Sequence, residues 1–123
     1  MRIPVTTLND GYDFPLLGLG TYKLSDEDVN KVIRRAIELG YRHIDTASFY
    51  GNEEAVGKAL NDAISAGDVT REDLFVTTKL WNDDQDRVAA AYQESLKRLD
   101  LEFIDLYLVH WPWPQKGLYV SAF

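Results

Sequence analysis

Residues 40–57 read GYRHIDTASFYGNEEAVG and contain one transition from a strand to a helix. The segment YRHIDTA is typical of a strand, and Asn52 opens a helix whose apolar residues recur at helical spacing. Strand starts fall near residues 42, 74 and 104, and this recurrence of about 30 residues matches one strand–helix unit. Alternating strands and helices predict an α/β fold with a parallel sheet.

The remaining segments extend this pattern in both directions. The turn-forming cluster NDGYD separates two short apolar segments, so residues 1–18 are expected to form an N-terminal hairpin. Strand–helix repeats then span residues 16–111, with LLGLGTY, LFVTTKL and IDLYLVHW as further strands. Four strands and three helices make an open structure, because an eight-stranded barrel needs twice as many strands and roughly 250 residues.

Helix ends are marked by capping residues. Ser25 precedes an acidic first turn and Gly40 follows the last apolar position, which predicts the first helix. The second helix is expected to end at Gly67, and the third to begin at Asp83 or Asp84. On the third helix, the spacing of Glu94 and Arg98 predicts an exposed ion pair of little energetic weight; both residues lie in the segment QESLKR.

Composition excludes several classes of function. The chain has 123 residues, the size of one domain, and its net charge of -7 argues against binding to nucleic acid or to anionic membranes. It has no cysteine and only two histidines, so we expect no disulfide, no thiolate chemistry and no metal site. No stretch approaches the roughly 18 apolar residues of a membrane span, and no signal segment is apparent. We therefore expect a soluble cytoplasmic protein.

Three of the expected strands end with an ionisable side chain, namely Asp45, Lys79 and His110. Ligands of parallel α/β folds bind at the carboxyl ends of the strands. Tyr50, in the loop after the second strand, can reach the same place. These four side chains are therefore expected to converge on one site.

Such a set suggests a specific reaction. A lysine ammonium beside a tyrosine favours the phenolate, so Tyr50 could protonate an oxygen near neutral pH. Asp45 would keep Lys79 charged and oriented, and His110 could donate a second hydrogen bond as negative charge develops on that oxygen. This chemistry suits reduction of a carbonyl group by hydride transfer, with the hydride supplied by a cofactor.

Each of these residues also has a structural interpretation. Asp45 and Lys79 could form an ion pair that only joins two strands, while Tyr50 and His110 could be ordinary packing residues. Their convergence favours a functional site, because a buried ion pair contributes little net stability and clustered titratable groups are typical of active sites.

The other candidate features are less specific. The segment GLGT at residues 18–21 departs from GxGxxG, and no Walker motif is present. Its small residues could let a flat ring approach the backbone. Aromatic residues just beyond the strand ends could line an apolar pocket or pack in the core; they are Tyr22, Trp81, Trp111 and Trp113.

The quoted stretch resembles the first signature of the aldo-keto reductases. VTTKLW and LVHWP resemble the lysine and histidine segments of that family, in matching order and spacing, and the hairpin and LGLGTY match as well. Within the family, the chain looks similar to bacterial 2,5-diketo-gluconate reductases. The resemblance implies the N-terminal part of a (β/α)8 TIM barrel, with the hairpin covering the bottom of the barrel.

The resemblance also implies reduction of aldehydes and ketones with NADPH, although these residues do not distinguish NADPH from NADH. By position, Tyr50 would be the proton donor, Lys79 and Asp45 would tune it, and His110 would orient the carbonyl. The positions near the nicotinamide and its ribose would be Gly20, Thr21, Tyr22 and Asp45. The substrate-binding positions would be Tyr22, Phe49, Trp81, His110, Trp111 and Trp113.

Later segments of the family, which hold most of the cofactor, have no counterpart in residues 1–123, and residues 112–123 would start the substrate loop. We therefore expect a single truncated domain. One hypothesis is that it supplies the proton donor and its supporting residues to a carbonyl reductase that acts on a small molecule. Another is a catalytically silent fragment that folds by self-association through exposed sheet edges or by pairing with a complementary half. A third is a nucleotide-sensing relative without enzyme activity.

Overall fold

The computed structural model describes residues 2–123. Its first two strands form an antiparallel hairpin, and the other four form a parallel sheet in the order β3-β4-β5-β6. The predicted α/β fold with a hairpin and a parallel sheet is therefore confirmed. The strands are β1 (Val5–Thr7), β2 (Asp13–Pro15), β3 (Gly18–Gly20), β4 (His43–Asp45), β5 (Phe75–Leu80) and β6 (Leu106–Val109).

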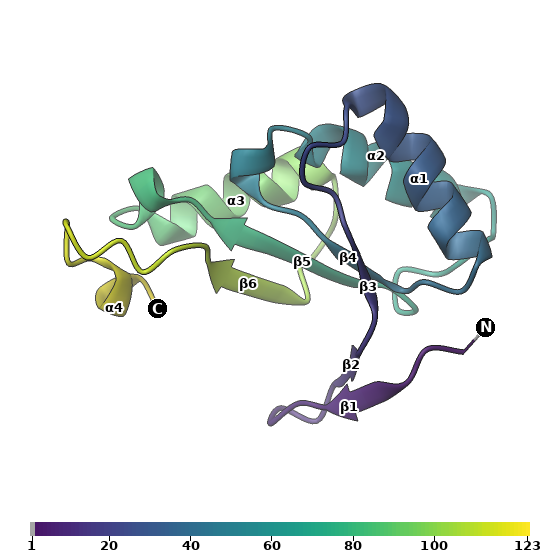
Figure 1. Cartoon of the computed structure of the whole chain (residues 1–123), viewed down its shortest axis with the longest axis horizontal. Helices are drawn as coiled ribbons and strands as arrows, with labels where there is room; N and C mark the ends of the chain where they lie inside the picture. The colour runs from purple at the N-terminus through teal and green to yellow at the C-terminus, as the bar shows by residue number, and fades with distance from the viewer. Residues whose placement is uncertain (1) are drawn as a thin grey trace.

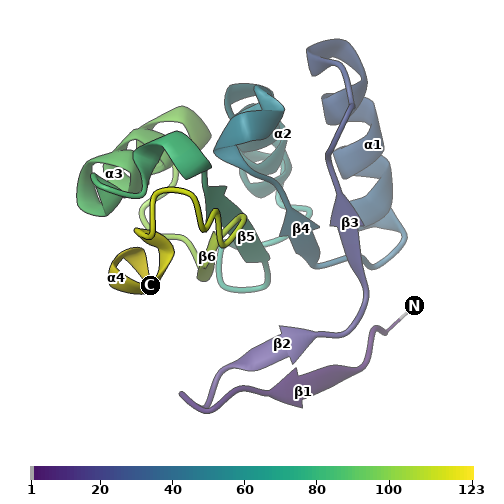
Figure 2. The same cartoon turned by 60° about the vertical axis from the view of Figure 1, so that its left-hand side comes forward.

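Three helices lie side by side on one face of the parallel sheet, and the hairpin lies across one end of it (Figures 1 and 2). No helix within residues 2–123 is long and apolar enough to cross a membrane. The helices are α1 (Asp26–Glu38), α2 (Glu53–Ser65), α3 (Val88–Leu99) and the short α4 (Tyr119–Ala122), with 3-10 turns η1 (Ser48–Tyr50) and η2 (Asn82–Asp84).

The predicted start of the third helix at Asp83 or Asp84 is wrong. These residues belong to the 3-10 turn η2, and α3 begins at Val88. The cause is the burial of Gln85, whose Nε2 donates a hydrogen bond to the carbonyl of Trp111, 2.9 Å away. This tertiary contact holds the preceding residues in a separate turn.

The main core lies between the helices and the outward face of the sheet. Ile44 and Val76 point from neighbouring strands into a cluster that includes Val29 and Leu60, all of them fully buried. Gly57 lets α2 approach the end of α3, because a Cβ atom there would lie 2.1 Å from the carbonyl oxygen of Leu99. Apolar side chains at helical spacing thus cover one face of the sheet.

A buried carboxylate joins α2, β5 and α3. The Glu53 side chain is 1% exposed and accepts hydrogen bonds from Thr78 Oγ1 at 2.8 Å and Arg98 Nε at 2.8 Å. The predicted pair of Glu94 with Arg98 is therefore wrong, since Arg98 turns inward to Glu53 and Glu94 pairs with Arg87.

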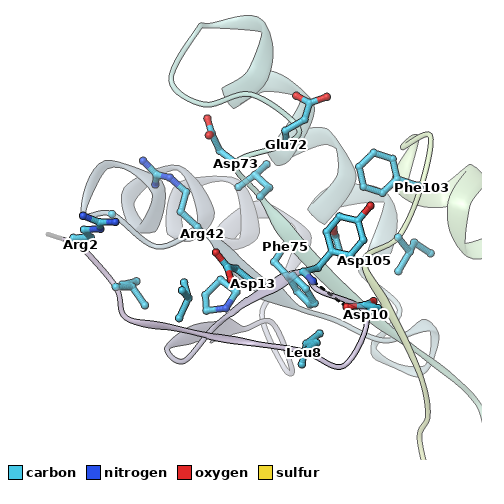
Figure 3. A pocket seen from close by; sticks show the side chains of 17 residues that line it. Arg2, Leu8, Asp10, Asp13, Arg42, Glu72, Asp73, Phe75, Phe103 and Asp105 are labelled. Carbon is cyan, nitrogen blue, oxygen red and sulfur yellow. Dashed lines mark hydrogen bonds between the residues drawn. The ribbon is translucent and has the colours of Figure 1, made fainter.

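The hairpin packs against the start of the parallel strands. Phe14 meets the rings of His43 and Phe75 edge to face, with centroids 5.0 Å away in both cases. A pocket of about 970 Å³ lies between the hairpin and the start of the parallel strands, and acidic, basic and apolar side chains line it (Figure 3). Its lining includes residues that precede β4, β5 and β6, so it opens at the opposite end of the sheet from Asp45, Lys79 and His110.

Candidate active site

Lys79 lies near the carboxyl end of β5 and binds three oxygen atoms. Its Nζ donates to Asp45 Oδ2 at 2.7 Å, to the carbonyl of Thr46 at 3.0 Å and to the Tyr50 hydroxyl at 3.0 Å. An ammonium group has three hydrogens, so each has a partner. The Lys79 side chain is only 12% exposed, and these bonds fix its position.

The loop after β4 places the Tyr50 hydroxyl beside this ammonium. Tyr50 ends η1, and Gly51 then adopts φ 72, a left-handed conformation that suits glycine and turns the chain into α2. The Ser48 hydroxyl donates to the carbonyl of Lys79 at 3.2 Å, which ties the loop to β5. A positive charge 3.0 Å from the phenol oxygen stabilises the anion that remains when the proton leaves.

His110 follows β6 directly, and its backbone N–H donates to the carbonyl of Leu80 at 3.1 Å. Its ring meets the Tyr50 ring edge to face, with centroids 5.7 Å apart. Its Nδ1 is buried and finds no hydrogen-bond partner within residues 2–123. Burial lowers the pKa of His110, and the nearby charge of Lys79 lowers it further. A neutral imidazole thus stands beside the phenol.

Aromatic side chains surround His110. Phe49 stacks on Trp81 with centroids 3.9 Å apart, and Trp81 lies 5.5 Å from the His110 ring. Trp111 is parallel to His110 at 6.4 Å. Trp113 lies instead under the ammonium of Lys116, at 4.8 Å. The structure thus gathers most of the predicted substrate residues around His110, and the Trp113 contact is with Lys116.

The predicted cofactor residues lie on β3 and just beyond it. Gly20 is opposite Asp45 in the strand register, and no atom lies within 4 Å of where its Cβ would be. A flat ring therefore has room to approach the backbone there. Thr21 is fully buried, and its hydroxyl donates to Thr46 Oγ1 at 2.9 Å. The Tyr22 ring packs on Tyr50, with centroids 4.9 Å apart.

Sequence reasoning missed four residues that support this site. Thr46 and Asn52 join the buried hydrogen bonds around Thr21, Ser48 ties the Tyr50 loop to β5, and Gln85 holds the Trp111 backbone. Three of them lie in the quoted stretch 40–57. Their polar side chains, so close to Asp45 and Tyr50 in the sequence, were the feature that could have identified them. Within residues 2–123, no three acidic or histidine side chains gather as a metal site.

The model of the Aldo/keto reductase family matches residues 16–119 of this chain. The chain belongs to the aldo/keto reductase family. The resemblance of the quoted signature is therefore confirmed. Among curated relatives, methylglyoxal reductase DkgA of Salmonella typhimurium is 56% identical over 118 residues, which cover 96% of this chain and 42% of that protein. NADP-dependent D-sorbitol-6-phosphate dehydrogenase of Malus domestica is 47% identical over 110 residues, covering 89% of this chain and 36% of that protein.

Solved aldo-keto reductase structures share this fold. That of Bombyx mori, in complex with NADP, gives a TM-score of 0.86 at 51% identity, covering 91% of this chain and 39% of its own. The aldo/keto reductase of Brucella melitensis gives a TM-score of 0.87 at 45% sequence identity. The match covers 97% of this chain and 45% of that one. The chain therefore has the fold of the N-terminal part of the family's (β/α)8 barrel. It spans less than half the length of the relatives described here.

Proposed function

We propose that this chain carries the proton-donating residues of a carbonyl reductase that acts on small aldehydes and ketones. The observation that carries the proposal is the single ammonium of Lys79, which binds both Asp45 and the Tyr50 hydroxyl. An ion pair that only joined two strands would not need the phenol. Family membership favours the same chemistry.

Each side chain has a separate role in the proposed reaction. Tyr50 gives its proton to the carbonyl oxygen as that oxygen becomes an alkoxide. Lys79 stabilises the phenolate that remains, and Asp45 balances the charge of Lys79 and holds its position. The His110 ring lies beside the Tyr50 ring and would donate a hydrogen bond to the same carbonyl oxygen, which aligns the carbonyl carbon for reduction.

NADPH, when bound, supplies the hydride in this proposal, and NADH is the alternative donor. The open space at Gly20 fits a flat nicotinamide ring beside Asp45. Tyr22, Phe49, Trp81 and Trp111 would exclude water from the substrate. A cytoplasmic location stays a prediction.

The test uses the 123-residue chain and a chimera that joins this chain to the part of the Salmonella relative that it does not match. Both are supplied with methylglyoxal and with NADPH carrying deuterium on the nicotinamide ring. We expect the chimera to consume NADPH and to place deuterium on the carbon of the new alcohol. A folded chimera that leaves methylglyoxal unreduced would overturn the proposal. NADH in place of NADPH measures the cofactor preference.

A second candidate concerns the 123-residue chain by itself, which we infer to self-associate. The edge strands β3 and β6 each have a free side in residues 2–123, and Leu108 on β6 is 38% exposed. Exposed strand edges favour pairing with another chain. Light scattering should give at least twice the monomer mass, and a well-folded monomer at low concentration would contradict self-association.

A further inference from the structure

Asn52 lies between the Tyr50 loop and α2, and its side chain does not cap the helix that it precedes. An asparagine at this position ordinarily accepts a hydrogen bond from the first helical turn, but Asn52 accepts none there. Its Nδ2 donates instead to the carbonyls of Thr21 at 2.9 Å and Leu24 at 3.2 Å. The residue is 3% exposed, so these bonds are shielded from water. Asn52 therefore joins the start of α2 to the loop between β3 and α1.

Two threonines complete a small ring of hydrogen bonds around Asn52. The Thr46 hydroxyl donates to Asn52 Oδ1 at 3.4 Å and accepts from the Thr21 hydroxyl at 2.9 Å. Both threonines are fully buried. A buried polar network whose members all have partners favours a single arrangement. The ends of β3 and β4 are thereby joined to the start of α2.

The loop that Asn52 binds contains a strained residue. Lys23 has φ 63, in the left-handed region that residues other than glycine rarely adopt. The two carbonyls that accept from Asn52 belong to Thr21 and Leu24, on either side of Lys23. The asparagine therefore holds this loop in a conformation that the Lys23 backbone disfavours.

Tyr22 lies in this strained loop, and its ring packs on Tyr50 at 4.9 Å. Tyr50 precedes Asn52 by two residues. Asn52 therefore belongs to the same segment as Tyr50 and binds the Thr21–Leu24 loop, which carries Tyr22. We propose that Asn52 is a positioning residue, which holds the Tyr50 ring against Tyr22 by binding the Thr21–Leu24 loop. This role rests on the proposed function, in which Tyr50 gives the proton.

The experiment compares aromatic ring contacts in the 123-residue chain by NMR, with tyrosine labelled in the ring. The wild-type chain should give a nuclear Overhauser effect between the Tyr22 and Tyr50 rings, and Asn52→Ala should lose it. Asn61→Ala is the matched control, because Asn61 also lies on α2 and its Nδ2 donates to the carbonyls of Leu99 and Asp100. We expect Asn61→Ala to keep the ring contact.

Asn52→Asp is the second variant, because it keeps the side-chain shape and the acceptor for Thr46 but lacks the amide donor. It too should lose the ring contact while the rest of the spectrum stays folded. A wild-type contact in Asn52→Asp, or its loss in Asn61→Ala, would overturn the positioning role. Failure of both Asn52 variants to fold would also overturn it and would leave Asn52 a purely structural residue.

A kinetic measurement separates this role from the proposed function. If the chimera reduces methylglyoxal, Asn52→Asp in the chimera should lower kcat by about 100-fold, because small displacements of a reacting group cost rate. KM should change less than kcat. If the wild-type chain gives the ring contact but the folded chimera leaves methylglyoxal unreduced, the proposed function fails and the positioning role stands.

Discussion

Lys79 and Asp45 differ in how much water reaches them, and this difference matters at the scale of single residues. The Lys79 side chain is 12% exposed, while that of Asp45 is 33% exposed. A charge that loses its partner costs more when water cannot replace that partner. The ammonium is therefore the member of the pair that depends more on the other.

This asymmetry predicts the relative stability of two variants. Asp45→Asn should lower the free energy of unfolding by about 2 kcal/mol, because it leaves the less exposed ammonium without a counterion. Lys79→Met should cost less, about 1 kcal/mol, since water can reach the carboxylate of Asp45. Urea unfolding measures both values. Glu38→Gln, which breaks an exposed pair with Arg35, is the control and should change stability very little. A larger loss of unfolding free energy in Lys79→Met than in Asp45→Asn would contradict the view that the ammonium depends more on its partner than the carboxylate does.

Among the elements, the strands were easier to predict than the contacts between loops. Alternation of faces along a strand and the strand–helix repeat place Asp45, Lys79 and His110 at one end of a sheet. The link between Thr21 and Asn52 joins residues from different loops, so it depends on a strand register that periodicity does not reveal. The start of α3 was mispredicted for the same reason, because the buried contact of Gln85 overrides the capping pattern.

The contact between α2 and α3 gives a prediction at this scale. Gly57→Ala should destabilise the chain by about 3 kcal/mol, because its new Cβ would meet the Leu99 carbonyl oxygen at 2.1 Å. The better helix propensity of alanine, about 1 kcal/mol, does not offset this clash. Thermal unfolding followed by circular dichroism measures the loss. Gly20→Ala is the control, because no atom lies within 4 Å of its Cβ position. Equal stability of Gly57→Ala and wild type would show that the helices can move apart.

The whole molecule separates two regions along its parallel sheet. The hairpin and its pocket cover the start of the strands (Figures 1 and 3), and Asp45, Lys79 and His110 lie at the other end of the strands. His43 connects the hairpin to the sheet through Phe14 and hydrogen-bonds Thr77 Oγ1 at 2.9 Å. Histidines therefore lie in both regions, and both affect the response of the molecule to pH.

Stability should fall as the pH falls from 7.5 to 5. Burial lowers the pKa of His43 and of His110. Near pH 6.5 the unfolded chain therefore binds protons at these two side chains that the folded chain does not bind. The contribution of the two neutral histidines to the free energy of unfolding is fully present above about pH 6.5 and is lost as the pH falls below that value. The carboxyls of Asp62 and Asp73 have lowered pKa values, so their contributions are lost only at more acidic pH. Urea unfolding at several pH values measures the slope.

A double variant, His43→Gln with His110→Gln, should flatten this slope, whatever its effect on stability at pH 7.5. An unchanged slope in the double variant would mean that other groups cause the loss of stability. The two histidines are the only ones in the chain, so no third imidazole complicates the comparison.

The most direct measurement of the role of Tyr50 is kcat/KM for methylglyoxal reduction by the chimera and its Tyr50→Phe variant. This substitution removes one hydroxyl and keeps the ring that packs on Tyr22 and His110. Tyr12→Phe, on the distant and exposed hairpin turn, is the matched control. We expect Tyr50→Phe to lower kcat/KM by roughly 10²- to 10⁴-fold and Tyr12→Phe to leave it unchanged. Wild-type kcat/KM in Tyr50→Phe would contradict the assignment of Tyr50 as the proton donor.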